Sequence, residues 1–544
     1  MAYFSLLYET KLSEDKIKES AKKQQLLKRV TDKKRKFEII GSKMVEITDN
    51  SDQYSSKVPA FFKDLNLDQI IEKIVLEDTD SILTETFYGL LQNKDEITYR
   101  QDIFKDLDKP VIYQSIMEFY SSISQVNQFI DYSEKANHTM QTCKYRLDAM
   151  CLYYESILQL VGKTSKYVDS TGLRKLHFLL KDYSECDIFL ELKNVSFSLK
   201  EKIESIHYNL TVLPGKILLH YKKEENDFSE KLKNVFFPDV EYHNEILFFR
   251  QVTLTDLELK IADNLYKKEK GLFMECSAFT TNHPDFRDSL IIQIHRELKF
   301  YISCRTYINT LKSKQFPFCY PDIVNNRGTE LKGIYDLVMA YKSKINTDII
   351  ANDLLLDKSH SGVWITGANQ GGKTTFARCI GQLTYFMLIG LPVPGLSARL
   401  PIYNGIFTHF STEENAETGN GKLKEELLRI KEMLFYTSGK NNLFILNELF
   451  SSTTTLDAFD MSKLLIQRLA ETDSVIICVT HIPSLAASCK EMLSLGTETG
   501  SSEKNRRTYR IIPKEAEPTA YASDIANQYQ LTYKQIKEEL EYEG

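Results

Sequence analysis

The sequence predicts a multidomain protein of the α and α/β classes, in which a region of long helices precedes an α/β domain. A chain of 544 residues is too long for one hydrophobic core, so several domains are expected. From about residue 61 to residue 343, apolar residues recur at helical spacing, as in "FFKDLNLDQIIEKIV", and prolines are few. After about residue 348 the short apolar strands "GVWIT", "NLFIL" and "SVIICVT" each end at a polar cluster and precede a helix-like segment, which predicts a largely parallel sheet.

Composition excludes several classes of protein. Hydrophobic residues make up 42% of the chain and charged residues 26%, which excludes a disordered or fibrous protein. The net charge of −6 gives no global attraction to nucleic acid. The nine cysteines are scattered without a C-x-x-C pair, so reduced buried thiols are expected. Neither a long apolar run nor a signal peptide is found, so we expect a cytoplasmic protein without a membrane partner.

Changes in pattern divide the chain into four expected regions. Residues 1–58 carry the run "KIKESAKKQQLLKRVTDKKRKF", which predicts an exposed basic helix, either a solvated face or a nucleic-acid contact. Residues 59–345 form a helical core or lever region, in which residues 192–250 alternate apolar and polar side chains around "TVLPG" and indicate a small β-containing insertion. Residues 346–515 form the α/β domain, and 516–544 a helical C-terminal segment.

A phosphate-binding loop follows the first strand of the α/β domain. "GANQGGKT" matches G-x-x-x-x-G-K-[ST] at every fixed position, between an apolar strand and a helix-compatible stretch. Its glycines let backbone N–H groups face phosphate oxygens, and the helix N-terminus adds positive potential. Lys373 is expected to reach the outer phosphates of ATP, and the Thr374 hydroxyl to bind Mg²⁺. The expected nucleotide-binding loop comprises Gly367, Ala368, Asn369, Gln370, Gly371, Gly372, Lys373, Thr374 and Thr375.

Two further strands carry candidate catalytic residues at their carboxyl ends. "LFILNELF" delivers Asn447 and Glu448, where ligands of open α/β sheets gather, although a pair of polar residues can also merely cap a strand. Asp457 follows after the hydroxyl-rich "SSTTT". The strand "SVIICVT" ends at His481, and a lone histidine there is more often structural. We expect Lys373, Glu448 and His481 to converge on a terminal phosphate.

These motifs together resemble the MutS family of DNA mismatch-repair ATPases, whose nucleotide domains have the ABC-type architecture. "TGANQGGKTT" is similar to the family's loop, with Ala368 in place of proline and Gln370 in place of the usual methionine. "IFTHFSTEENAETGNGKLKEEL" (406–427) resembles the family's signature segment, and "EPTAYASDIANQYQLTYKQIKEEL" its closing helices, which pair the subunits. Weaker likeness in "ITYRQDIF" and "SCRTYINTLKSKQFPFCYPDI" extends through the helical region.

The resemblance implies a fold, a site and a mechanism. The helical region would act as levers carrying a clamp, for which the insertion at 192–250 is the candidate. Residues matching Ile349 and Ile350 would pack against the base of ATP. Glu448 would activate the attacking water and His481 would sense the γ-phosphate, while the signature segment would act on the nucleotide of a second subunit. A homodimer is therefore expected.

Departures from the family pattern qualify this expectation. The segment ahead of the helical region is shorter than the family's mismatch-reading module, so recognition through an intercalating phenylalanine is not expected. The family's signature serine is replaced near Gly421, with Lys422 beside it. Asn447 stands where an aspartate normally holds Mg²⁺, and a neutral amide predicts a weaker metal site and a slow but competent ATPase.

Three functions are compatible with the sequence. The favoured hypothesis is a dimeric, ATP-dependent clamp or DNA-structure sensor in mismatch repair, recombination control or related DNA maintenance, which contacts the backbone of duplex or branched DNA. The first alternative is an ATP-gated protein whose levers grip another protein. The second is an RNA- or ribosome-associated ATPase, suggested only by the basic N-terminal run.

Overall fold

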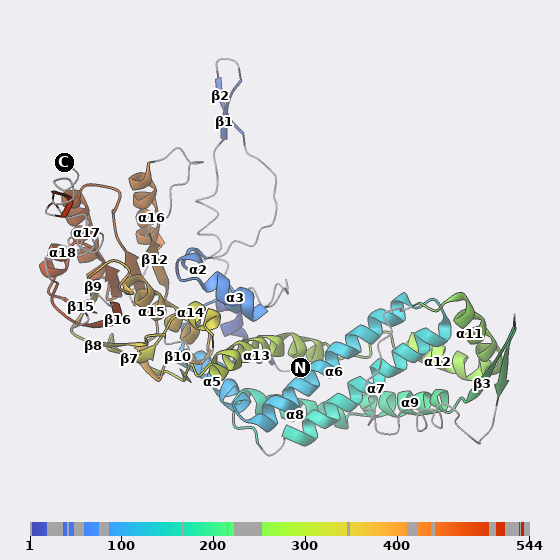
Figure 1. Cartoon of the computed structure of the whole chain (residues 1–544). Coiled ribbons are helices and arrows are strands. Elements are labelled where there is room, and N and C mark those ends of the chain that lie inside the picture. Colours follow the sequence, from blue (N-terminus) through green and yellow to red (C-terminus); the bar gives the residue numbers. More distant parts are fainter. Residues whose placement is uncertain are drawn as a thin grey trace. The chain divides into compact units, whose positions relative to one another are not determined.

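The structure is a computed structural model, shown in Figure 1, and it divides the chain into two units. One comprises Met1–Lys105 and Phe300–Gly544, and the other Asp106–Lys299. This division differs from the expected boundaries, because residues 59–105 and 300–345 belong to the same unit as the α/β domain. The structure describes residues 3–18, 36–40, 43–47, 59–75, 86–164, 167–214, 216–221, 253–344, 349–410, 421–436, 441–499, 507–516, 533 and 535–537.

A six-stranded sheet forms the centre of the first unit. Its strands, in spatial order, are β12 (Ile406–Phe410), β13 (Leu443–Asn447), β14 (Val475–Val479), β9 (Gly362–Thr366), β15 (Met492–Thr499) and β16 (Arg507–Pro513). All neighbouring pairs are parallel except β15 and β16. Strands β9, β13 and β14 are buried throughout, as near-continuous apolar sequences predict for a sheet covered on both faces. The predicted largely parallel sheet is confirmed.

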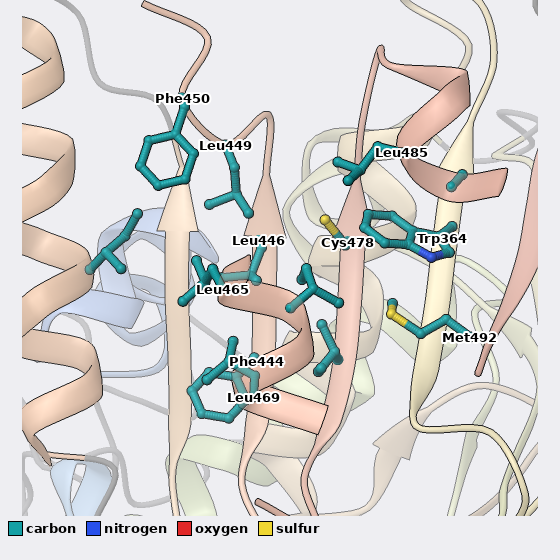
Figure 2. Packing of buried hydrophobic residues seen from close by; sticks show 14 of the residues in the cluster. Trp364, Phe444, Leu446, Leu449, Phe450, Leu465, Leu469, Cys478, Leu485 and Met492 are labelled. Atoms are coloured by element: carbon teal, nitrogen blue, oxygen red, sulfur yellow. The ribbon is translucent and has the colours of Figure 1, made fainter. Parts of the chain in front are cut away.

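One face of this sheet packs against helices that follow its strands, namely α16 (Lys422–Tyr436), α17 (Thr455–Ala470) and α18 (Pro483–Ser488). Figure 2 shows Phe444 and Leu446 of β13 and Trp364 of β9 on this face, in one core with Leu465 and Leu469 of α17. Phe444 and Trp364 are fully buried, and truncating such a side chain to alanine costs about 3–5 kcal/mol of stability.

Helix α16 buries a different stripe from the one its leucines suggest. In the sequence, Leu423, Leu427, Ile430 and Leu434 recur at helical spacing and predict one apolar stripe; of these, Leu423, Ile430 and Leu434 pack against the core. Leu427, expected on the same stripe, is 42% exposed. Glu426, one residue earlier, is buried instead, because the buried face of α16 is centred on Glu426, Ile430 and Met433.

The opposite face of the sheet packs against α15 (Lys373–Leu388), which in turn contacts α2 (Ala60–Asp64), ahead of α3 (Leu67–Val75). The rings of Phe61 and Phe62 lie 6.1 and 5.3 Å from the ring of Tyr385 on α15. The Tyr385 hydroxyl donates to the Phe87 carbonyl at 2.8 Å. Segments from the N-terminal part of the chain therefore complete the core around the helix that follows the phosphate-binding loop.

A smaller sheet and several helices complete the first unit. The smaller sheet has the order β6-β11-β7-β8, and β5 pairs with β10. The strands β1 (Lys36–Ile40) and β2 (Lys43–Ile47) form an antiparallel hairpin. The basic helix predicted at 16–37 lies largely outside the described residues, as do most of 516–544. The remaining elements are β5 (Phe318–Cys319), β6 (Asp322–Val324), β7 (Thr329–Ile334), β8 (Asn352–Leu356), β10 (Val393–Pro394), β11 (Ser397–Pro401), α14 (Leu337–Lys342), and α5 (Lys94–Leu107) and α13 (Ser289–Ser313), which both cross the unit boundary.

In its described residues, the second unit contains long helices and a β-hairpin. Its helices are α6 (Pro110–Lys135), α7 (Thr139–Thr164), α8 (Thr171–Glu185), α9 (Asp187–Glu204), α11 (Asp256–Lys268) and α12 (Lys270–Asn282). The antiparallel strands β3 (Tyr208–Leu213) and β4 (Lys216–Tyr221) confirm the predicted strands around "TVLPG". The insertion does not begin at 192, because α9 continues to Glu204 with Ser196 and Leu199 buried. Residues 222–250 lie outside the described residues.

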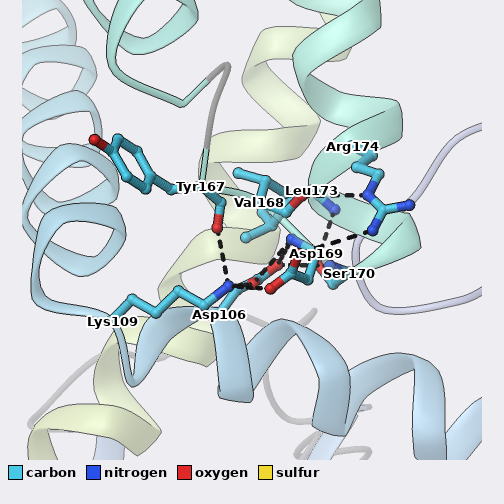
Figure 3. Close-up of polar contacts among 8 residues, drawn as sticks. All are labelled: Asp106, Lys109, Tyr167, Val168, Asp169, Ser170, Leu173 and Arg174. Carbon is cyan, nitrogen blue, oxygen red and sulfur yellow. Dashed lines mark hydrogen bonds and ion pairs between the residues drawn. The ribbon is translucent and has the colours of Figure 1, made fainter.

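A buried carboxylate fixes the connection between α7 and α8. Asp106 accepts hydrogen bonds from the backbone N–H groups of Asp169 (3.1 Å) and Ser170 (2.7 Å), and from Lys109 Nζ (2.7 Å). Figure 3 shows Lys109 between Asp106 and Asp169, where it also donates to the Tyr167 carbonyl at 2.9 Å. These hydrogen bonds hold the pKa of Asp106 below its usual value despite burial, so the charged form anchors the connection.

Two general expectations can be compared with the described residues. All nine cysteines are free, and most of them are buried, as predicted. Among the described helices, none is long and apolar enough to cross a bilayer.

Candidate functional site

The phosphate-binding loop joins β9 to α15 through strained backbone. Gly367 and Gly372 have φ values of 121° and 92°, and Gln370 has a φ of 59°. A Cβ on Gly367 would lie 2.2 Å from Thr497 Oγ1 of β15, so only glycine fits there. The Thr497 hydroxyl also accepts from the Ala368 backbone N–H at 3.3 Å. Asn369 and Gln370 are exposed, whereas Gly371 is buried. The loop therefore presents Asn369 and Gln370 to solvent.

Lys373 begins α15 and folds back over the loop. Its Nζ donates to the carbonyl oxygens of Gly367 (2.6 Å) and Ala368 (2.9 Å). The residue is only 5% exposed, and this burial lowers its pKa to about 8, which the charge of Glu448 partly opposes. The ammonium is therefore held by dipoles and not by a bonded carboxylate, which leaves it available for an anionic ligand.

Thr374 and Asn447 bring two oxygens together at the end of β13. Thr374 Oγ1 donates to Asn447 Oδ1 at 2.9 Å. Asn447 is buried, and its Cα is in register with Val479 of β14, which is in register with Ile365 of β9. The next residues along these strands therefore emerge at the same edge of the sheet. Thr375, the last predicted loop residue, is half-buried on α15.

Glu448 and His481 face each other at this edge. Glu448 has a left-handed φ of 54°, which costs a non-glycine residue about 1–2 kcal/mol, and its backbone N–H donates to the Val479 carbonyl at 3.0 Å. Its carboxylate oxygen Oε1 and His481 Nε2 are hydrogen-bonded to each other. This bond is the main cause that lowers the pKa of Glu448. The structure thus brings Lys373, Asn447, Glu448 and His481 to one edge of the sheet.

Tyr509 was not identified from the sequence. A Cβ on Gly372 would lie 3.7 Å from a ring carbon of Tyr509, and the side chain is 49% exposed. The Asn352 side chain fixes this part of β16, because it donates to the Tyr509 carbonyl (3.1 Å) and accepts from Ile511 N–H (2.7 Å). Ile349 is half-buried and Ile350 36% exposed, three and two residues before Asn352. No spacing in the sequence indicated that β16 returns to the loop.

Asp457 has a structural role at the start of α17. Its backbone N–H donates to Thr454 Oγ1 at 3.3 Å, and the Thr454 hydroxyl donates to its carboxylate at 2.7 Å. This is an N-cap arrangement, and it explains the residue without a ligand.

The signature segment is described at its two flanks, β12 and the helix α16 that starts at Lys422, and residues 411–420 lie outside the described residues. Gly421 is exposed. The carboxylate of buried Glu426 accepts a hydrogen bond from the Ser452 hydroxyl at 3.1 Å. Ser452 lies in the turn after Glu448. This contact was not foreseen, because a glutamate in a charged helix gives no sign of burial.

Comparisons with known proteins agree with this geometry. The family model "MutS domain V" matches residues 363–534, which include the phosphate-binding loop, Glu448 and His481. Over this region the chain is similar to domain V of the MutS family. The MutS match begins at the second residue of β9 and therefore includes every strand of the large sheet that carries these residues.

Three curated relatives bear the name DNA mismatch repair protein MutS. The protein of Staphylococcus haemolyticus is 24% identical over 266 residues, 46% of this chain and 29% of that protein. The protein of Halalkalibacterium halodurans is 26% identical over 278 residues, 49% of this chain and 31% of that protein. The protein of Lysinibacillus sphaericus is 24% identical over 300 residues, 52% of this chain and 34% of that protein. The match thus spans about a third of the length of each MutS relative.

Proposed function

We propose that this protein is an ATP hydrolase of the MutS type that couples its nucleotide state to DNA binding. The observation that carries the proposal is the convergence of Lys373, Thr374, Asn447, Glu448 and His481 at the carboxyl edge of one parallel sheet. A lysine on a glycine loop, a carboxylate that can activate water and a histidine that can contact a phosphate together support cleavage of a terminal phosphate.

The chain's own residues have separate tasks in this reaction. The N–H groups of the loop and the N-terminus of α15 bind the phosphates, and Lys373 exchanges its two carbonyl contacts for phosphate oxygens. Glu448 accepts a proton from the attacking water once His481 has turned from the carboxylate to the γ-phosphate. In the nucleotide-free protein, the hydrogen bond to His481 occupies the Glu448 carboxylate. The carboxylate is released to activate water only when a nucleotide competes for the histidine.

The residues present fit Mg²⁺. Thr374 Oγ1 and Asn447 Oδ1 already lie at hydrogen-bonding distance, and oxygen atoms of this kind are ligands that Mg²⁺ accepts alongside water and substrate phosphates. Among the described residues there is no cluster of three or more histidine, cysteine or acidic side chains, so the metal would depend on the phosphates for most of its charge. When bound, Mg²⁺ neutralises charge on the transferring phosphoryl group.

Tyr509 completes the proposed nucleotide site. We propose that its exposed ring, which lies near Gly372, stacks on a nucleobase whose phosphates occupy the loop. Ile349 and Ile350 are proposed to pack against the same base, because Asn352 ties the segment that carries them to Tyr509.

The DNA-binding and dimeric parts of the proposal rest on the family. The relatives are named mismatch repair proteins, and the match covers the ATPase region that in the resemblance pairs two subunits. The helices of the second unit and the β3–β4 hairpin are the proposed levers and clamp. Contacts there are expected mainly with phosphates and are therefore salt-sensitive.

Steady-state ATP hydrolysis by the purified protein tests this function. The rate is measured alone and with homoduplex, mismatched, branched and single-stranded DNA, with RNA as competitor and Glu448→Gln as the blank. A Glu448-dependent rate that one class of DNA raises or lowers is the expected result. Hydrolysis that responds only to RNA favours the RNA-associated alternative, and hydrolysis that responds to no nucleic acid favours a protein partner. The absence of Glu448-dependent hydrolysis overturns the proposal.

A further inference from the structure

Asp64 is a buried carboxylate outside the region that matches the family model. It is the last residue of α2, and it is 8% exposed. Its Oδ2 accepts from Thr408 Oγ1 of β12 at 2.6 Å and forms an ion pair with Arg429 Nη2 of α16. A carboxylate so far from water persists in its charged form only with such partners, so its position is determined by them.

The same arginine also holds the end of β12. Arg429 donates to the backbone carbonyls of Thr408 (3.3 Å, from Nη2) and Phe410 (3.3 Å, from Nη1). Phe410 is the last residue of β12, and Arg429 lies in the third turn of α16. Asp64 and Arg429 therefore fix the strand before residues 411–420 and the helix after them to each other.

A second arginine connects this cluster to the phosphate-binding helix. Arg378 Nε donates to the Asp64 backbone carbonyl at 2.9 Å, and its guanidinium lies 5.1 Å from the centre of the Phe410 ring. Arg378 is on α15, five residues after Lys373. One carboxylate and two arginines thus join α2, α15, β12 and α16 within a single unit.

We propose that Asp64 is a positioning residue for ATP hydrolysis, which sets the flanks of the signature segment relative to the phosphate-binding helix. This inference rests on the proposed function, in which the signature segment acts in the hydrolytic step. Because Asp64 contacts neither the loop nor Glu448, its loss leaves ATP binding intact and slows the step that needs the signature segment. It also assigns the N-terminal segment around α2 a part in the ATPase cycle.

Burial and charge explain why an aspartate is required here. Desolvation raises the pKa of Asp64, and Arg429 is the strongest opposing influence. Removing the carboxylate leaves Arg429 part-buried without its counter-ion, so it is free to release the carbonyls of Thr408 and Phe410. Misplacement of catalytic groups by about 1 Å can cost ~10²-fold in rate, so loss of this contact should produce a measurable decrease in kcat.

Asp64→Asn and Arg429→Gln, singly and together, test the inference. Both singles are expected to lower kcat by at least about tenfold, with KM and the Kd of a fluorescent ATP analogue within about twofold of wild type. The double variant is expected to be no slower than the slower single, because both remove one interaction. The matched control is Asp68→Asn, an exposed aspartate four residues later, which should behave as wild type.

The outcomes separate this inference from the proposed function. If the wild-type chain shows no Glu448-dependent hydrolysis, the proposed function fails and this inference fails with it. If wild type hydrolyses ATP and Asp64→Asn has an unchanged kcat, the inference alone fails. If Asp64→Asn and the milder Arg429→Lys both lose ATP binding together with their thermal unfolding transition, Asp64 only supports the fold and the positioning role is refuted.

Discussion

Replacing Lys373 by methionine is expected to stabilise the nucleotide-free protein while it abolishes ATP binding. The residue is 5% exposed, and in the described part of the chain its ammonium is bonded by the carbonyls of Gly367 and Ala368 and by no carboxylate. The fold therefore retains a buried positive charge, and under the proposed function its counter-ion is the phosphate of ATP. Methionine keeps the length and apolar volume of the side chain and removes the charge.

The size of the effect follows from the lysine's pKa. Burial lowers it from an ordinary value of 10.5 to about 8, and each unit corresponds to about 1.4 kcal/mol, which sets an upper bound of about 3 kcal/mol. The two carbonyl contacts contribute roughly 1 kcal/mol each in the wild type and are lost in the variant. The expected net stabilisation at pH 7 is about 1–2 kcal/mol, or a few degrees in Tm.

The dependence on pH has a definite sign. Below pH 8 the lysine is charged in both the folded and the unfolded chain, so the wild type carries the full cost of burial. Between about pH 8 and 10.5 the unfolded chain binds more protons than the folded chain, so the stability of the wild type rises with pH relative to the variant. The advantage of Lys373→Met should shrink from pH 8 upward.

Urea unfolding at pH 7.0 and pH 9.5, with and without MgATP, measures both effects. Lys431→Met, at an exposed position on α16, controls for the general effect of replacing lysine by methionine. MgATP should stabilise the wild type and Lys431→Met but not Lys373→Met. A Lys373→Met protein less stable than wild type at pH 7, or a stability difference that grows with pH, refutes this reasoning.

Three further predictions concern the same edge of the sheet. Glu448→Gln should bind ATP with near wild-type affinity and hydrolyse it at least about 10²-fold more slowly, trapping an ATP-bound dimer in size-exclusion chromatography; elution as a monomer with MgATP would contradict the dimeric site. Asn447→Asp should lower the Mg²⁺ concentration for half-maximal hydrolysis about tenfold or more and raise turnover, because a carboxylate replaces the amide that accepts from Thr374; an unchanged Mg²⁺ titration would refute the role of Asn447. Tyr509→Ala should weaken ATP binding by about 1 kcal/mol, roughly fivefold, while Tyr509→Phe should not; equal losses would implicate the hydroxyl and exclude stacking.

Much of the large sheet was predictable from short-range pattern. Strands β9, β13 and β14 are continuous apolar segments with polar residues at their ends, and a strand buried on both faces requires that pattern. The hairpin β3–β4 was predictable because a Pro-Gly turn separates two alternating segments. The sequence did not predict that residues 59–105 pack with the α/β domain, because Phe61 and Phe62 give the same helical signal whichever core they enter.

The candidate site divides in the same way. Residues that precede or follow strands in fixed motifs, such as Lys373 and Glu448, could be placed from local sequence, since parallel strands bring their carboxyl ends to one edge. Tyr509 and Asp64 could not, because each reaches its partner across a long stretch of chain, and Glu426 could not, because a glutamate in a charged helix gives no sign of burial. Asp457 shows that local pattern can also describe a purely structural role, since a hydroxyl-rich turn before an aspartate is typical of an N-cap.

The sequence by itself determined the phosphate-binding loop, the parallel sheet behind it and the residues at the strand ends, because spacing along one short segment dictates backbone geometry and hydrogen bonding locally. Only the tertiary structure decided which charges are buried and which groups neutralise them. It placed Lys373 among carbonyls, paired Glu448 with His481, and brought Asp64 to Arg429 across more than three hundred residues. Desolvation and ion pairing depend on distance in space, and that distance is set by packing between elements far apart in the chain.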